Sequence, residues 1–280
     1  MRLAIIPGTP KPVVAKTFGR YIPERMDDFA WENDKVAFRM YGKALESKPS
    51  ENAYGMDVWA KRTSALVVNK WYKLNNYHKD NGEGLDYYHV GYTLGAGNIA
   101  PMNADTIVYP KNYRQYKVLD SGPLRISFEL SYESWNVGAV PVTVTKRFTL
   151  DAGSQLNKVE AQFNYNGSTE LPVAIGIIRR NEPGSIVLNE KAGIMAYWEP
   201  QHGEDGIIGT ACIFPTPVKQ MRTDKWHLLT VSSANSSAPF VYYNGAAWNK
   251  AGAITSDAQW FAYLQDYAAK IKSPVRIEVK

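Results

Sequence analysis

The sequence predicts an all-β protein, built from meandering antiparallel sheets with a few short helices. Residues 124–132 read L-R-I-S-F-E-L-S-Y, and this alternation of apolar and polar residues has the period of a strand with one buried face. The same style recurs at residues 142–150, 156–165, 173–178 and 227–232. Glycine-containing polar stretches at 151–154 and 166–168 separate some of these segments, as hairpin turns do.

Two segments break this pattern and are predicted to be helices. In residues 57–74, apolar residues spaced along the segment could line one side of a helix, with Trp59 and Trp71 among them. In residues 256–271, Ser256 is a suitable N-cap, and aromatic residues such as Trp260 and Tyr267 recur at helical spacing. We expect this aromatic stripe to pack in the core. A final strand is expected at 275–279.

The chain is expected to form one β-sandwich domain over residues 1–280. Its 45% hydrophobic residues can bury a full core, and no Pro/Ser-rich or charge-dense linker divides it. The net charge of +5 comes from 32 basic and 27 acidic residues, and the basic residues are scattered. Scattered charge argues against nucleic-acid binding, whereas a mildly basic surface suits an anionic ligand such as a uronate.

Several kinds of site are excluded by what the sequence lacks. A single cysteine, Cys212, allows no internal disulfide and no cysteine cluster for a metal. The sequence contains no G-x-S-x-G elbow, no phosphate-binding glycine loop and no H-E-x-x-H. No stretch is long and apolar enough to span a membrane, and the opening residues are too short for a complete signal peptide.

The richest polar segment is residues 77–89, Y-H-K-D-N-G-E-G-L-D-Y-Y-H. Its two glycines let the backbone turn tightly, so that side chains can converge. His78 belongs to the side-chain class that exchanges protons near neutral pH, and a neighbouring carboxylate such as Asp86 can fix its tautomer. Tyr77, Tyr87 and Tyr88 can donate protons or stack on a sugar ring.

The same segment also allows a metal site. Asp80, Glu83 and Asp86 recur at intervals of three residues and offer the hard oxygen ligands that a divalent cation such as calcium prefers. They do not follow the EF-hand pattern, and no other cofactor is expected. A solvated connecting loop remains the plain alternative for the whole segment.

Two further segments hold candidate residues. Residues 198–206 form a second glycine-flanked loop, in which His202 and Glu204 could complete a site with His78, and Trp198 could stack on a sugar. Residues 20–41 mix arginines, carboxylates and aromatic residues, which favours a partly buried ion network. Three arginines of that segment could instead grip a substrate carboxylate: Arg20, Arg25 and Arg39.

Four stretches resemble a bacterial family, the domain of unknown function 4861. They are P-E-R-M-D-D-F-A-W-E-N-D-K-V-A-F-R-M-Y-G at 23–42, G-M-D-V-W-A-K-R at 55–62, Y-H-K-D-N-G-E-G-L-D-Y-Y at 77–88 and G-E-D-G-I-I-G-T-A at 203–211. The resemblance implies a fold similar to the galactose-mutarotase-like supersandwich, an antiparallel β-sandwich that also occurs in polysaccharide lyases. It further implies an exported protein of Bacteroidetes, encoded beside enzymes that degrade pectin and xylan. A periplasmic or secreted location, with any signal peptide trimmed, is therefore expected.

Three functions remain open on this basis, all with an oligosaccharide or polysaccharide partner. The favoured one is β-elimination on uronate-containing, pectin-like fragments, with Arg39 or Arg62 neutralising the substrate carboxylate, His78 as base and Tyr88 as acid. The second is glycoside hydrolysis by two carboxylates of the polar loops. The third is sugar binding without catalysis. The expected substrate contacts are Trp31, Trp59, Lys61, Tyr77, Asp86, Tyr87, Trp198 and Glu204.

Overall fold

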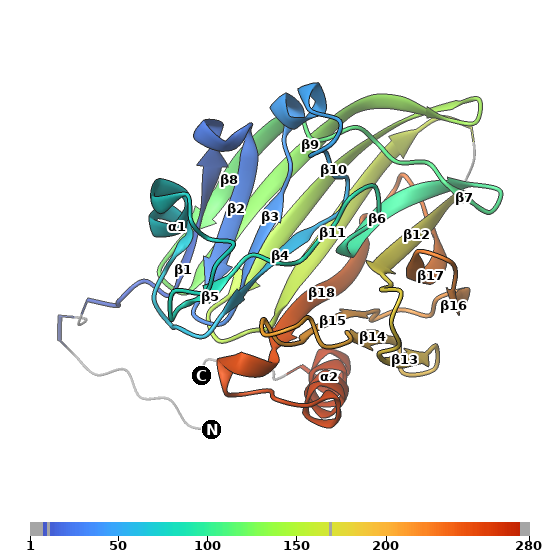
Figure 1. Cartoon of the computed structure of the whole chain (residues 1–280). Helices are drawn as coiled ribbons and strands as arrows, with labels where there is room; N and C mark the ends of the chain where they lie inside the picture. The colour runs from blue at the N-terminus through green and yellow to red at the C-terminus, as the bar shows by residue number, and fades with distance from the viewer. Residues whose placement is uncertain (1–7, 10–11, 168–169, 275–280) are drawn as a thin grey trace.

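Strands dominate the structure, which is a computed structural model that describes residues 8–9, 12–167 and 170–274 (Figure 1). A first sheet has the order β1 (Thr17–Ile22), β2 (Asp28–Asn33), β3 (Ala37–Met40), β4 (Asp57–Lys61), β5 (Gly84–Leu85). A large sheet has the order β13 (Ser185–Asn189), β14 (Ile194–Trp198), β15 (Ile208–Ile213), β18 (Phe240–Trp248), β11 (Leu156–Tyr165), β10 (Val140–Asp151), β9 (Arg125–Val137), β8 (Gln115–Ser121). A third sheet has the order β16 (Gln220–Thr223), β17 (His227–Ala234), β12 (Leu171–Ile178), β6 (Ala96–Asn103), β7 (Thr106–Ile107).

The first and third sheets lie side by side against the large sheet, so the molecule is an antiparallel β-sandwich, as expected (Figure 1). Phe29 of β2 stacks on Phe128 of β9 with ring centroids 4.1 Å apart, and Tyr242 of β18 donates a hydrogen bond to the carbonyl of Gly97 on β6. A parallel bridge next to β4 and β6 joins the first and third sheets. The aromatic contacts between the layers form the centre of the hydrophobic core.

The predicted strands at 124–132, 142–150, 156–165, 173–178 and 227–232 lie within β9, β10, β11, β12 and β17, give or take a residue at their ends. The helix predicted at 57–74 is wrong in its first half, because residues 57–61 form β4 and only Val68–Leu74 form helix α1. Both faces of β4 are buried, so apolar residues at successive positions imitate the spacing of a helix. The strand expected at 275–279 falls outside the described residues.

Helix α2 (Asp257–Lys272) confirms the second predicted helix and its packing role. The Ser256 hydroxyl accepts a hydrogen bond from the Gln259 backbone N–H at 3.3 Å, which caps the first turn. Trp260 and Leu264 are fully buried against β14 and β15. Short 3₁₀ turns complete the set: η1 (Pro23–Arg25), η2 (Lys43–Ser47) and η3 (Asn249–Ala251). Neither α-helix of the described chain has the length and apolar character needed to cross a bilayer.

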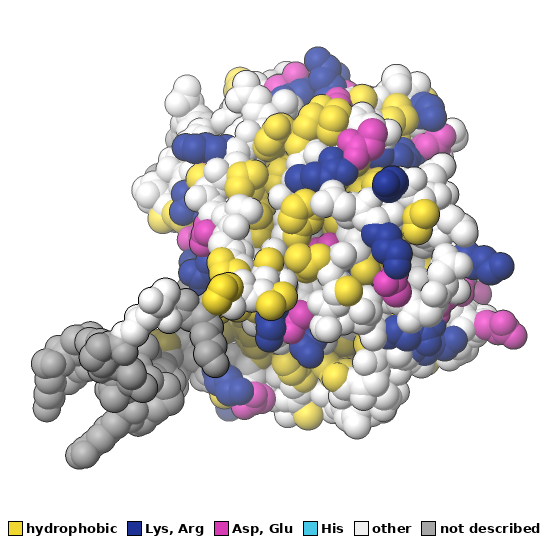
Figure 2. Space-filling view, turned by 90° about the vertical axis from the view of Figure 1, so that its left-hand side faces the viewer, with side chains coloured by type: hydrophobic (Ala, Val, Ile, Leu, Met, Phe, Trp, Pro, Cys, Tyr) yellow, Lys and Arg dark blue, Asp and Glu magenta, His cyan; other side chains and the backbone are white. Residues whose placement is uncertain are grey.

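Strand β8 is the outer edge of the large sheet on the side that Figure 2 shows. Tyr116, Val118 and Leu119 of this strand are exposed, and Tyr116 stacks on Tyr21 of β1 at 4.8 Å. Figure 2 shows hydrophobic side chains in a broken band on this side, with basic and acidic side chains close to one another around it. Both signs of charge are therefore interspersed on this face, and neither is concentrated there.

The outer face of the first sheet, opposite the sandwich core, is covered by α1 and by residues 75–83 and 86–92, on either side of β5. We call these segments the cover. Side chains alternate along β2: Phe29 and Trp31 point into the sandwich, whereas Asp28, Ala30 and Glu32 point toward the cover. All of them are buried, because both faces of the strand are occupied. Buried charged residues on the outer face are therefore enclosed between the sheet and the cover.

Candidate functional site

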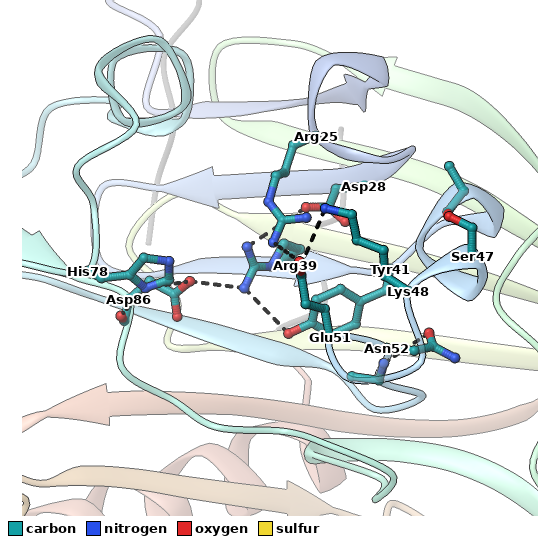
Figure 3. A network of polar contacts seen from close by, with 12 residues as sticks. Arg25, Asp28, Arg39, Tyr41, Ser47, Lys48, Glu51, Asn52, His78 and Asp86 are labelled. Atoms are coloured by element: carbon teal, nitrogen blue, oxygen red, sulfur yellow. Dashed lines mark hydrogen bonds and ion pairs between the residues drawn. The ribbon is translucent and has the colours of Figure 1, made fainter.

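Arg39 of β3 lies at the centre of a buried charge cluster on the outer face of the first sheet. Antiparallel pairing sets Asp57 of β4 directly opposite Arg39, and pairs Ala30 of β2 with Arg39 on the other side. Asp28, two residues before Ala30, shares the face of Arg39 on a diagonal. Asp86 comes from the cover. Strand register and the cover together bring three carboxylates around one guanidinium, and Figure 3 shows two of them, Asp28 and Asp86, beside Arg39.

The contacts within this group, which we call the Arg39 cluster (Asp28, Arg39, Asp57 and Asp86), are close. Arg39 forms ion pairs with Asp57 and with Asp86, the latter at 2.9 Å, and lies 3.8 Å from Asp28. Its guanidinium also lies over the rings of Tyr41 and Trp59, with centroids at 5.0 and 5.4 Å. Only 5% of Arg39 is exposed. The guanidinium is therefore enclosed by groups of the protein and hydrogen-bonded through Nη2, whereas its Nε and Nη1 have no hydrogen-bond partner within the described residues.

Three carboxylates facing one arginine retain protons more readily than exposed aspartates do. Burial raises the pKa of Asp28 to about 7 despite the nearby Arg39, and Tyr72 donates a hydrogen bond to its carboxylate at 3.1 Å. Burial, followed by repulsion from Asp86, raises the pKa of Asp57 to about 7. The pKa of Asp86 is also raised, mainly by burial. The cluster can thus hold protons near neutral pH.

This arrangement predicts that stability falls as the pH rises. The folded chain keeps the Asp28 proton up to about pH 7, whereas the unfolded chain releases it near 3.8, the ordinary pKa of an aspartate. The folded state therefore binds more protons between these pH values, and raising the pH within this window lowers the free energy of unfolding. In urea denaturation at pH 5 and pH 8, Asp28→Asn should lose less stability over this interval than the wild type. Equal losses in the two proteins would contradict the assignment.

A cavity of about 430 Å³ adjoins the Arg39 cluster, a size typical of small-molecule sites. It brings together several residues that the sequence singled out, and its lining includes Arg25, Arg39, Tyr41, Glu51, His78, Asp86, Tyr87, Tyr88, His89 and Tyr92. Cationic, acidic, imidazole and phenolic groups thus share one polar cavity with aromatic walls. These are the group types that bind a sugar and exchange protons with it.

His78 has a defined hydrogen-bonding state at the mouth of this cavity. Its Nδ1 lies 2.9 Å from the backbone carbonyl of Asp86, and the side chain is 68% exposed. Because a carbonyl oxygen only accepts hydrogen bonds, the neutral imidazole carries its proton on Nδ1 and leaves the lone pair on Nε2. The Asp86 carboxylate lies 3.7 Å from the same nitrogen and favours this tautomer. His78 is thus set up to accept a proton at Nε2.

The second polar loop, residues 198–206, contacts a residue of the cavity wall. The His202 ring stacks on Tyr87 with centroids 5.1 Å apart, and its Nδ1 contacts Asp205 at 3.0 Å. The loops at 77–89 and 198–206 therefore touch. His202 itself is not among the residues that line the cavity with His78. Its stacking contact assigns it to the support of Tyr87.

An additional buried ion pair holds this wall. Arg180 contacts Glu199 at 2.9 Å, donates to the His89 carbonyl at 2.8 Å and lies over the Tyr88 ring at 4.7 Å. Burial raises the pKa of Glu199 to about 7 and also raises the pKa of Tyr88 well above its usual value. Tyr88 consequently stays protonated at physiological pH, and its hydroxyl is enclosed without a hydrogen-bond partner among the described residues.

Several predicted substrate contacts are corrected by their burial. Trp31 lies in the sandwich core, Trp198 belongs to the cluster under α2, and Trp59 is enclosed by Trp71, Tyr72 and Tyr77. None of these rings presents a free face to a sugar. Tyr77 is itself buried in that stack. Aromatic residues give the same sequence pattern in a sheet that is buried on both faces as on a surface that binds sugars. The sequence alone therefore could not distinguish core aromatic residues from substrate contacts.

The charged residues that were expected to bind substrate or metal also have other partners. Lys61 is 2% exposed and pairs with Glu32 at 2.5 Å. The expected cation site is not formed: Asp80 pairs with Arg62, Glu83 pairs with Lys70 at 2.8 Å, and Asp86 pairs with Arg39. No group of metal-ligating side chains converges within the described residues. Glu204 is exposed, and its backbone carbonyl accepts a hydrogen bond from Lys250.

The sequence interpretation missed Asp57, which belongs to the Arg39 cluster, and Tyr41, which lines the cavity. A signal for Asp57 was present, because a carboxylate between Met56 and Val58 in an apolar run needs a buried partner. Its partner, however, depends on the register of β3 and β4, which local sequence does not specify. The sequence offers Arg25 only as one of three candidate arginines, and the structure places it at the cavity.

The fold and the site together define a β-sandwich protein with a polar, aromatic-walled cavity between one sheet and its cover. Comparison with known proteins then gives its family. The chain belongs to the family described as domain of unknown function DUF4861, which matches residues 9–277. A protein of Formosa agariphila, Uncharacterized protein P7, is 31% identical over 283 residues, covering 94% of this chain and 70% of that protein.

A solved structure is also similar to this chain. It is the α-galactosidase AgaA of Geobacillus stearothermophilus, from glycoside hydrolase family 36, in complex with raffinose. The TM-score is 0.40 and the sequence identity 9%, over 84% of this chain and 43% of the galactosidase. The chain thus spans less than half the length of that enzyme.

Proposed function

We propose that this protein is a carbohydrate-active enzyme that cleaves uronate-containing, pectin-like oligosaccharides by β-elimination. The observation that carries the proposal is the cavity in which the free Nε2 of His78, the Arg25 guanidinium and tyrosine side chains converge. Elimination needs a base for the C5 proton, a cation for the substrate carboxylate and a proton donor for the leaving oxygen. One cavity supplies all three.

The proposed step assigns one role to each group. His78 Nε2 removes the C5 proton, whose acidity increases when a cation neutralises the adjacent carboxylate. The C–H electron pair forms the C4–C5 double bond, and the C4–O bond breaks toward the leaving sugar. Tyr92, an exposed tyrosine of the cavity lining, donates a proton to that oxygen in place of Tyr88, whose hydroxyl is enclosed in the protein. The products are an unsaturated uronate and a new sugar end.

The cation in this step is revised relative to the sequence interpretation. Arg39 is enclosed by its three carboxylates, and Arg62 pairs with Asp80, so neither is available to a substrate carboxylate. Arg25 is partly exposed and lines the cavity. Within the described residues its one ion pair is with Glu51, at the long distance of 3.6 Å. We therefore assign carboxylate recognition to Arg25. Arg39 is a positioning residue, because it holds Asp86, whose backbone carbonyl orients His78.

A second candidate is glycoside hydrolysis, which the raised pKa of Asp86 favours. A carboxylic acid whose pKa is raised by burial keeps its proton to higher pH and is better suited to protonate a leaving oxygen, and Asp86 lines the cavity. Glu51, on the same cavity, is the other carboxylate available for that mechanism. The Arg39 ion pair opposes this role, since it holds Asp86 inside the cluster.

One assay separates these functions. The protein is incubated with pectic, xylan-derived and arabinogalactan oligosaccharides, and ultraviolet absorbance of unsaturated uronate is followed together with reducing ends. We expect new absorbance with a uronate-containing substrate. Reducing ends without absorbance would instead support hydrolysis, and binding without either product would support a sugar-binding protein. We also propose a periplasmic or secreted location, where such fragments are encountered, and fractionation of the producing cells tests it.

A further inference from the structure

A second hollow, of about 490 Å³, adjoins the cavity on the far side of Arg25. Arg25 and Glu51 line both the cavity and this second hollow. The lining of the second hollow also includes Lys48, Tyr72 and Asn75. It lies between η1, the C-terminal end of α1 and residues 48–51. A ligand longer than one sugar unit could therefore extend from the cavity past Arg25 into this hollow.

Glu51 lies between two cations at the boundary of the two hollows (Figure 3). Its carboxylate is 3.6 Å from Arg25 and 3.4 Å from Lys48, both longer than a tight charge-assisted hydrogen bond. All three side chains are partly exposed, so these pairs can be broken at little cost. The other acid at the rim, Glu24, is bonded to Arg20. One carboxylate thus serves two cations, and an incoming anion can take its place.

The wall beneath this boundary is held in a fixed conformation. Met26 and Asp27 have φ values of 51° and 64°, an uncommon pair of left-handed residues that are not glycine. The Asp27 carboxylate accepts hydrogen bonds from the Tyr21 hydroxyl and the Ala44 backbone N–H, which maintains this turn. Backbone strain of this kind persists where the surrounding structure enforces it, often at ligand sites. The hollow is therefore preformed.

We propose that the second hollow is a subsite for a second uronate unit, whose carboxylate replaces Glu51 between Arg25 and Lys48, so that Arg25, at the boundary, pairs with the carboxylates of both units. This inference rests on the proposed function and adds the substrate class: a chain of at least two acidic sugars. Glu51 occupies the position of the ligand carboxylate in the free protein and keeps the two cations in place. Two cations that share one carboxylate can bind a planar anionic group more strongly once that acid is removed.

The test measures binding by calorimetry with galacturonic acid, its dimer and its trimer, in the His78→Ala background so that no substrate is consumed. We expect the dimer to bind at least about tenfold more tightly than the monomer, because the subsite adds a charged contact and a second ring. Lys48→Ala should weaken dimer binding about fivefold, and Glu51→Gln should strengthen it by a similar factor. Lys73→Ala removes an exposed lysine of α1 outside both hollows and is the matched control.

Two results would overturn the subsite. Equal affinities for monomer and dimer, or equal effects of Lys48→Ala and Lys73→Ala, would show that the second hollow takes no uronate. If the wild type nevertheless forms unsaturated product, the proposed function survives this result. Absence of binding at every chain length, together with absence of product, would overturn both proposals.

Discussion

His78→Ala should lower the turnover of a uronate-containing substrate about 10²- to 10⁴-fold, the usual contribution of a general base. The melting temperature should remain nearly unchanged, because the side chain is exposed and makes one hydrogen bond, to the Asp86 carbonyl. His78→Gln can still donate to this carbonyl but offers no basic nitrogen, so it should be equally inactive. Steady-state absorbance kinetics and a thermal melt measure both effects.

The neighbouring Lys79→Ala provides the control for this prediction. Lys79 is exposed in the same segment of the cover and does not line the cavity that contains His78. Its substitution should leave turnover within about twofold, as is usual for surface changes away from a site. Full activity in His78→Ala would mean that the base has been misassigned. Activity lost along with a lowered melting temperature would instead point to a structural role.

Arg39→Met should destabilise the protein by about 3–5 kcal/mol at pH 8, the typical cost of leaving buried charges without their partner. The substitution preserves much of the side-chain length but leaves three buried carboxylates without a counter-ion. At pH 5 the loss should be smaller, because Asp28 and Asp57 have pKa values of about 7 and take up protons there. Urea denaturation at both pH values measures the difference.

The matched control for Arg39 is Arg147 on β10. Arg147 pairs with Glu129 at 2.7 Å, but both side chains are partly exposed, so Arg147→Met should cost no more than about 1 kcal/mol. Similar stability of the two variants would show that the Arg39 cluster is hydrated or already neutral. It would also remove the basis for treating Arg39 as the residue that positions Asp86.

Local sequence predicted the part of the site that comes from one segment. His78, Asp86, Tyr87 and Tyr88 are near one another in the chain, and the backbone at Gly84 has a φ of 125°, which allows the tight turn that brings them together. The Arg39 cluster could be predicted only in outline. Its partners come from two other strands and the cover, and no single segment specifies their register.

The fold was predictable for a related reason. Strands β9, β10 and β11 have one covered and one largely solvated face, so their alternation is visible in the sequence. The first sheet is buried on both faces, and there the alternation disappears. This accounts for the error at 57–61 and for the wrong prediction that Trp31 and Trp59 contact substrate. The same double burial that obscured the sequence pattern is what encloses the charge cluster.

The cavity lies between the sandwich and a thin layer of chain. The residues that stabilise the fold are therefore largely separate from the residues that contact a ligand. Leu85, Tyr88 and Val90 of this layer belong to the main hydrophobic core, whereas exposed residues at the cavity rim, such as Glu51, His89 and Tyr92, can change without disturbing it. Selection can therefore alter which ligand is admitted while the sandwich core of the protein stays the same. Proteins built on this plan should differ more from one another at these exposed rim positions than in the sandwich core.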